Sequence, residues 1–282
     1  MRQSGRSTVF HHGYSELLFY SEFAVTNGKF DCVSVKIGYA LTDVAVENGS
    51  FAVIPGSHKS SYANPYHLEE PDETHPLVQT CPCQAGDAVI SSEDLTHGAV
   101  RNRSGKSRRT IFASYAPAFQ AAWDDQLDMA EGFETRATPV RWDCGFQSKA
   151  GQSQLGWGME PRAKKKKQNV RPFQTGTGQR NLSEEDRYAF DIAGFLILEG
   201  LLTNDQVRES QARLEETLSS PPSQVKREQN GPEVELLNVA ECGGVLEDIL
   251  ASDRLLKVME ELILGNQIRL VAPARFLENQ ES

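Results

Sequence analysis

Two neighbouring stretches carry the pattern that decides the fold: GDAVISSEDLTHGAV (residues 86–100) and RRTIFASYAP (residues 108–117). Each holds a short apolar run that ends in turn-forming or polar residues, which is typical of β-strands. Upstream, SEFAVTNGKFDCVSVKIGYALTDV (residues 21–44) repeats the pattern, and Asn27-Gly28 interrupts it as a hairpin turn would. FAVIPG (residues 51–56) adds a further strand at similar spacing. Residues 20–120 are therefore predicted to form an all-β sandwich or barrel.

The pattern changes after this region. Residues 148–182 are rich in Gly, Gln and Lys and have no apolar period, which predicts a flexible basic linker. Beyond it the sequence turns helical, with a cap at Ser183, a capping box at Thr203 and a cap at Asp253. GFLILEG (residues 194–200) and QIRLV (residues 267–271) are predicted to be strands between or after these helices.

Composition narrows the classes of protein. The chain has 282 residues, 39% of them hydrophobic and 24% charged, which is typical of a globular protein with local disorder at most. Its net charge of −10 argues against a nucleic-acid binder, because such proteins neutralise phosphates with excess Lys and Arg. No stretch approaches the ~20 apolar residues of a membrane helix. We expect a cytoplasmic protein with neither nucleic-acid nor membrane partners.

The five cysteines are an odd number without regular spacing, which favours reduced thiols. Cys81-Pro-Cys83 has two interpretations, as a metal or redox pair or as ordinary strand-edge thiols. The second interpretation is preferred because a single C-x-C is a weak signal.

Two histidines lie where a metal site would need them. His97 follows the strand GDAVIS, and His11 opens the β-rich region, so a jelly roll would bring both rings together at its mouth. Arg108 stands at the head of a strand with Thr110 two residues on, facing the same side. This pair suits a carboxylate held by a bidentate ion pair and a hydrogen bond. Structural histidines and an edge charge on a strand are the competing interpretations.

Several motifs occur together in one order: VKIGYALTDVAVENG (residues 35–49), NGSFAVIPGSHKSSY (residues 48–62), GDAVISSEDLTHGAV and the Arg-Arg strand. In this order they resemble the latter half of the phytanoyl-CoA dioxygenase (PhyH) family of Fe(II)- and 2-oxoglutarate-dependent oxygenases, over roughly residues 5–125. The resemblance implies a double-stranded β-helix, or jelly roll, so the predicted fold class is mainly β, cupin-like, with helical support from the C-terminal part.

The resemblance also implies roles for single residues. The family's first and distal iron-binding histidines fall on His11 and His97. Its 2-oxoglutarate arginine falls on Arg108, with Thr110 beside it and Arg109 as the alternate if the register slips by one. The family's PGSH turn falls on residues 55–58, which predicts turn chemistry and a substrate-side wall.

One position departs from the family. The family pairs its first histidine with a carboxylate two residues on, but this chain reads His11-His12-Gly13. Glycine there resembles related halogenases, in which a halide takes the carboxylate's place, and it also fits a lineage that has lost iron and serves as a binding or scaffold module. His12 or Glu16 are the alternative third ligands, although His12 should face away from His11.

The C-terminal region extends the resemblance in an unexpected order. Residues 182–218 and 253–271 resemble the opening helices and strands of the same family. The predicted organisation is thus a C-terminal family half at residues 1–147, the linker at 148–182, and an N-terminal family half at 183–282. A circular permutant, a slice of a tandem array or an imperfect gene model, and a half-domain swap with a second copy all explain this order.

These observations predict a dioxygenase that uses Fe(II), bound by His11 and His97, and 2-oxoglutarate, bound by Arg108 and Thr110. Its expected reaction is hydroxylation of a small organic substrate, with halogenation and an inactive scaffold as alternatives. The substrate's identity does not follow from a fold-level likeness.

Overall fold

A computed structural model describes the chain over residues 8–12, 23–60, 62, 64–117, 182–230, 233–263, 268–270 and 274–279. Residues 118–181, which include nearly all of the predicted linker, lie outside the described part.

A small antiparallel sheet forms one wall of the fold. Its strand order is β1-β8-β5-β6. The strands span β1 (Thr8–His11), β5 (Phe51–Val53), β6 (Gln79–Cys81) and β8 (His97–Ala99). A separate two-stranded hairpin, β2 (Val25–Thr26) and β3 (Lys29–Phe30), turns at Asn27 and Gly28. Both turn residues have positive φ, of 52° and 73°, as a primed hairpin turn requires.

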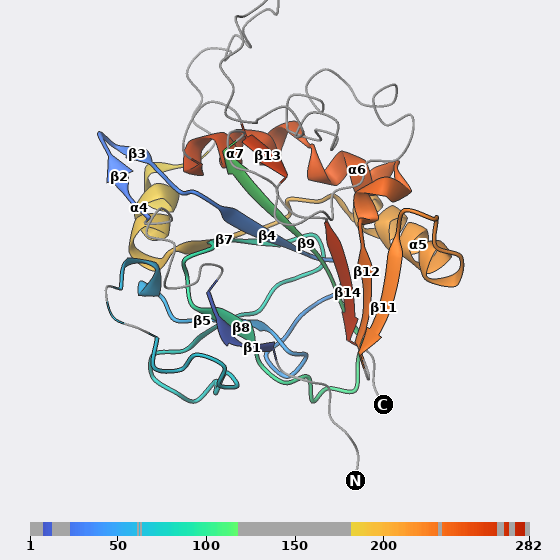
Figure 1. The fold of residues 1–282 in the computed structure, drawn as a ribbon, viewed down its shortest axis with the longest axis horizontal. Helices are drawn as coiled ribbons and strands as arrows, with labels where there is room; N and C mark the ends of the chain where they lie inside the picture. The colour runs from blue at the N-terminus through green and yellow to red at the C-terminus, as the bar shows by residue number, and fades with distance from the viewer. Residues whose placement is uncertain are drawn as a thin grey trace, which may run out of the picture.

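A larger antiparallel sheet forms the opposite wall, with strand order β10-β7-β4-β9-β14-β12-β11 and β13 paired to β9. Its strands are β4 (Val35–Ala40), β7 (Ala88–Ser92), β9 (Arg108–Pro117), β10 (Phe195–Leu198), β11 (Lys226–Asn230), β12 (Glu233–Leu237), β13 (Ile268–Leu270) and β14 (Arg275–Asn279). Figure 1 shows the small sheet facing the large one across the interior.

The chain alternates between the two sheets. It passes from β1 in the small sheet to β4 in the large one, returns for β5 and β6, and then takes β7, β8 and β9 in the large, small and large sheets. This alternation of facing antiparallel strands is a double-stranded β-helix, so the predicted fold class is confirmed.

Four α-helices belong to the described part: α4 (Glu184–Ala193), α5 (Asn204–Ser219), α6 (Val245–Leu250) and α7 (Asp253–Leu262). Two short 3-10 turns span Ser57–Lys59 and Val239–Cys242. The predicted caps at Ser183 and Thr203 are confirmed as full capping boxes. The predicted cap at Asp253 is wrong by one residue, because the Ser252 hydroxyl accepts from the Leu255 N–H and Asp253 is already helical.

The helices cover the side of the large sheet that faces away from the small sheet. Figure 1 shows α6 and α7 above β4 and β9, with the small sheet below. Two buried tyrosines fasten this layer: Tyr39 donates to the Ile249 carbonyl at 2.8 Å, and Tyr115 donates to the Leu250 carbonyl. Side chains alternate across a strand, so the neighbours of these tyrosines on β4 and β9 point into the space between the sheets.

Strands from both ends of the chain share the large sheet. β10 pairs with β7 from Phe195 opposite Ser91, and β14 pairs with β9 from Arg275 opposite Phe112. Residues 183–282 therefore complete the sheet that residues 1–117 begin, within one chain. The predicted domain boundaries, the reversed order of family halves and the swap with a second copy stay predictions.

Among the described residues, no helix combines the length and the apolar character needed to cross a membrane.

Candidate functional site

A cavity of about 340 Å³ lies between the two sheets. His11 and His97 line it from the small sheet, and Lys36, Arg108 and Thr110 line it from the large sheet. The C-terminal segment contributes as well, through Glu235, Arg275 and Leu277 on β12 and β14.

The two predicted metal-binding histidines lie side by side in this cavity. They occupy opposite positions in the pairing of β1 with β8, and their ring centroids are 4.3 Å apart at an interplanar angle of 55°. His11 Nδ1 lies 2.9 Å from the Val9 carbonyl, and His97 Nδ1 lies 2.7 Å from the Leu95 carbonyl. A carbonyl only accepts, so Nδ1 carries the proton in both rings and each Nε2 keeps its lone pair.

Burial lowers the pKa of both imidazoles, and that of His97, which is 2% exposed, falls well below its usual value. The nearby Lys36 ammonium adds to the lowering for both rings. Both histidines are consequently neutral near pH 7, the state in which imidazole binds a metal ion.

The third ligand has no candidate among the described residues, which contain no group of three His, Cys, Asp or Glu side chains placed to hold a metal ion. Gly13 and Glu16 lie outside the described part. The His12 ring lies 6.0 Å from that of His67, and it is not part of the cavity lining. This agrees with the expectation that His12 faces away from His11.

Arg108 is the cavity's most buried cation, at 6% exposed. One of its Nη atoms donates to the Gly49 carbonyl, and its Nε is buried with no hydrogen-bond partner among the described residues. Burial lowers the pKa of this guanidinium, and the charge of Glu233 opposes that shift. Thr110 stands two residues further along β9 on the same wall.

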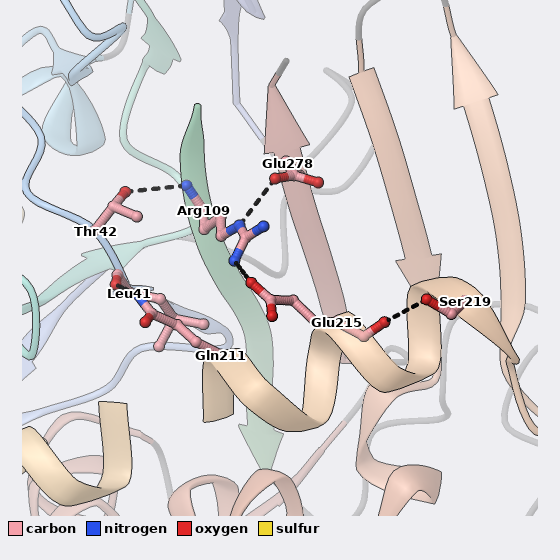
Figure 2. Close-up of polar contacts among 7 residues, drawn as sticks. All are labelled: Leu41, Thr42, Arg109, Gln211, Glu215, Ser219 and Glu278. Atoms are coloured by element: carbon pink, nitrogen blue, oxygen red, sulfur yellow. Dashed lines mark hydrogen bonds and ion pairs between the residues drawn. The ribbon is translucent and has the colours of Figure 1, made fainter. Parts of the chain in front are cut away.

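Arg109 lies on the opposite face of β9. Its Nε donates to Glu278 on β14 at 2.8 Å, and Nη1 donates to Glu215 on α5 at 2.9 Å. Figure 2 shows the side chain directed at these two carboxylates, with its backbone N–H bonded to Thr42. Arg109, predicted as the alternate cofactor residue, is thus outside the cavity lining and joins three elements instead.

Residues 55–58 form a turn, as predicted, with Gly56 at a φ of 82°. They are absent from the lining of the described cavity, so their role as a substrate-side wall stays a prediction. His58 instead packs under the end of α4. Its Nε2 donates to the Asp191 carbonyl at 3.1 Å, and its ring contacts Phe23 edge-on at 4.4 Å. A Cβ on Gly194 would lie 2.5 Å from His58 Nδ1, so this contact requires glycine. The turn therefore attaches the C-terminal segment to the barrel.

Several cavity residues were not predicted. Lys36, Ser91 and Ser114 project from three neighbouring strands, and Cys81 and Cys83 line the cavity from β6 and the bridge after it. The two-residue spacing of the cysteines signals a shared face, but only the register of distant strands brings the other three together. The described cysteines, all except Cys144, are free, as predicted.

Comparison with known proteins agrees with the motif order. Residues 5–110 match the family described as phytanoyl-CoA dioxygenase (PhyH). The dioxygenase olcK of Penicillium canescens is 31% identical over 118 residues, 42% of this chain and 34% of the relative. The dioxygenase cdmD of Talaromyces verruculosus is 30% identical over the same shares. The matched part of the chain thus spans about a third of the length of these relatives.

Similar solved structures include HygX from Streptomyces hygroscopicus with nickel and 2-oxoglutarate bound, which is 26% identical with a TM-score of 0.39. The match covers 44% of this chain and 57% of that one. AviO1 from Streptomyces viridochromogenes Tue57 is 22% identical with a TM-score of 0.30, over 44% of this chain and 49% of that one.

The motifs that match the family are those whose strands build the cavity: β4, β5, β7, β8 and the start of β9 all fall within residues 5–110. Residues 5–110 are thus similar to the phytanoyl-CoA dioxygenase family over the strands that bring His11, His97 and Arg108 to the cavity.

Proposed function

We propose that the protein is an Fe(II)- and 2-oxoglutarate-dependent dioxygenase that hydroxylates a small organic substrate. The observation that carries the proposal is the meeting, in one cavity, of two neutral histidines and a buried arginine with an unpartnered donor.

The histidine pair fits a divalent metal ion. Both Nδ1–H groups are held by backbone carbonyls, which orients the rings and raises the basicity of the two Nε2 atoms. Water, a halide or a residue outside the described part supplies the remaining positions, and an open coordination sphere is what an oxygenase needs.

Arg108 fits the distal carboxylate of 2-oxoglutarate. A buried guanidinium with an unpartnered Nε is costly unless a ligand accepts from it, and a carboxylate forms the strongest such contact. Thr110 adds a hydroxyl on the same wall. Phe112 lies two residues beyond Thr110 on β9, and its apolar ring limits access of water to the Arg108 end of the cavity.

Iron with 2-oxoglutarate and O₂, when bound, supplies the oxidation that converts a substrate C–H to C–OH while 2-oxoglutarate becomes succinate and CO₂. The chain's residues bind and orient: His11 and His97 hold the metal, and Arg108 with Thr110 fixes the co-substrate's far end. The two sheets exclude bulk water from the space between them.

The test is an anaerobic titration with Fe(II) and 2-oxoglutarate, followed by the visible charge-transfer band of the chelate. We expect the band in the wild-type chain, its loss in His11→Gln and in His97→Gln, and its retention in the control His12→Gln. Thermal unfolding of each variant checks that the fold persists.

A folded wild-type chain that gives no band contradicts the proposal and favours a barrel without iron. A band that requires chloride assigns the vacant ligand position to a halide and favours halogenation over hydroxylation.

A further inference from the structure

Three polar side chains form a row across the floor of the cavity, away from Arg108. Lys36 on β4 is directly opposite Ser91 on β7 and Ser114 on β9, so the three lie at one level of the sheet. All three line the cavity. Ser91 and Ser114 are 2% and 6% exposed, so both are buried residues that line the cavity wall. The row thus presents two hydroxyls and one ammonium to the cavity.

The charge of the row is already balanced. Lys36 Nζ lies 2.9 Å from Glu93 Oε1, and the Glu93 side chain is 2% exposed, whereas that of Lys36 is 22% exposed. Glu93 is not part of the cavity lining, so it pairs with the ammonium from outside the cavity. The ammonium keeps further N–H donors for a ligand in the cavity. Because the pair is net neutral, a carboxylate brought to Lys36 would face the buried charge of Glu93.

An apolar step separates this row from the arginine end. The next row along the same strands is Val89, Gly38 and Phe112, and a Cβ on Gly38 would lie 2.9 Å from the Phe112 ring. Ser114 is six residues from Arg108 on β9, about 20 Å along the strand. One molecule of 2-oxoglutarate bound at Arg108 is too short to reach the row, which is therefore available to a second ligand.

We propose that Lys36, Ser91 and Ser114 form the substrate-binding end of the cavity and select an uncharged oxygen acceptor, such as a ketone or lactone carbonyl, over a carboxylate. Lys36 lines the same cavity as both histidines, so a ligand held by the row would share that cavity with the proposed metal site. This inference rests on the proposed function for the oxidation of the bound molecule, but binding at the row requires neither metal nor 2-oxoglutarate.

The experiment measures binding of three matched bicyclic probes to the metal-free chain by ligand-observed NMR: 1-tetralone, its parent hydrocarbon tetralin, and 1,2,3,4-tetrahydro-1-naphthoate. We expect the ketone to bind about tenfold more tightly than tetralin, equal to about 1.4 kcal/mol, and more tightly than the carboxylate. Ser91→Ala/Ser114→Ala keeps the buried ion pair and should reduce the preference to about twofold, as should Lys36→Met/Glu93→Gln, which removes both charges together.

Lys59→Met is the matched control, because it breaks the exposed Lys59–Asp191 ion pair away from the cavity and should leave the preference intact. The inference is overturned if the wild-type chain shows no ketone preference, if the carboxylate binds best, or if folded row variants keep the preference. A 2-oxoglutarate titration separates the two proposals: its failure with the ketone preference intact contradicts only the cofactor assignment.

Discussion

Arg108 and Arg109 are adjacent in sequence, yet they face opposite sides of one strand. The cavity holds Arg108, whereas Arg109 reaches across to β14 and α5. Because side chains alternate along a strand, Arg108 faces the cavity and is available to a ligand, whereas Arg109 forms structural ion pairs.

We predict that Arg108→Ala weakens 2-oxoglutarate binding by about 30-fold to 1,000-fold, because a buried charge-assisted pair is worth about 2–4 kcal/mol. Arg109→Ala should bind 2-oxoglutarate within about threefold of wild type. It should instead lower the free energy of unfolding by about 1–3 kcal/mol, because the buried Glu278 loses its arginine. Calorimetric titration and urea unfolding measure the two effects, and equal losses of affinity would show that the register of β9 is wrong.

The sequence predicted His11, His97, Arg108 and Thr110 because each belongs to a motif of the resembling family. Lys36 escaped prediction because its partners, Ser91 and Ser114, are brought to it by strand pairing over 55 and 78 positions. Such pairing depends on the whole sheet rather than on a local pattern.

The elements were predicted best where capping chemistry marks an end. The Ser183 and Thr203 boxes are local, so sequence located both helices. β11, β12 and β14 lack such marks and a clear period, and they went unpredicted. The PGSH turn was identified as a turn, but its contact with α4 crosses 133 positions, from His58 to Asp191.

The contact between His58 and Asp191 makes the stability of the junction between α4 and the turn depend on pH. Burial lowers the pKa of His58 from an ordinary 6.5 to about 4, Lys59 adds to the lowering, and Asp191 opposes it. The unfolded chain thus takes up the proton first, so stability from this site is complete above pH 6.5 and is lost as the pH falls toward 4. We expect a loss of about 2 kcal/mol across this window.

Urea unfolding at several pH values, in wild type and in His58→Gln, measures this contribution. The variant should lose less stability between pH 6.5 and pH 4 than the wild type does. His67→Gln, at an exposed position, is the matched control. Parallel curves for wild type and His58→Gln would contradict the assignment.

At the scale of the whole molecule, one barrel is assembled from two distant segments. Sequence predicted the fold class and the likeness of both segments to one family. The sequence did not predict how the two segments pair. No local pattern indicates that β7 pairs with β10 or that β9 pairs with β14.

Since the two segments are held together by the sheet, we predict that separate fragments 1–147 and 183–282 reassemble. Each alone should lack a cooperative unfolding transition, and an equimolar mixture should regain it together with a 1:1 peak on size exclusion. Phe276→Asp, which places a charge at a fully buried position of β14, should prevent reassembly. A fragment 1–147 that unfolds cooperatively by itself would contradict the prediction.

The pairing of β9 with β14 also determines when the large sheet can be completed during synthesis. When Pro117 has just been added, Phe276 is still 159 residues from being added, and β7 and β9 each lack one neighbouring strand that is made later. The nascent chain must keep those edges from pairing with other chains until its last strands arrive. We therefore expect the yield of native protein to depend on the rate of translation and on chaperones more than its final stability suggests.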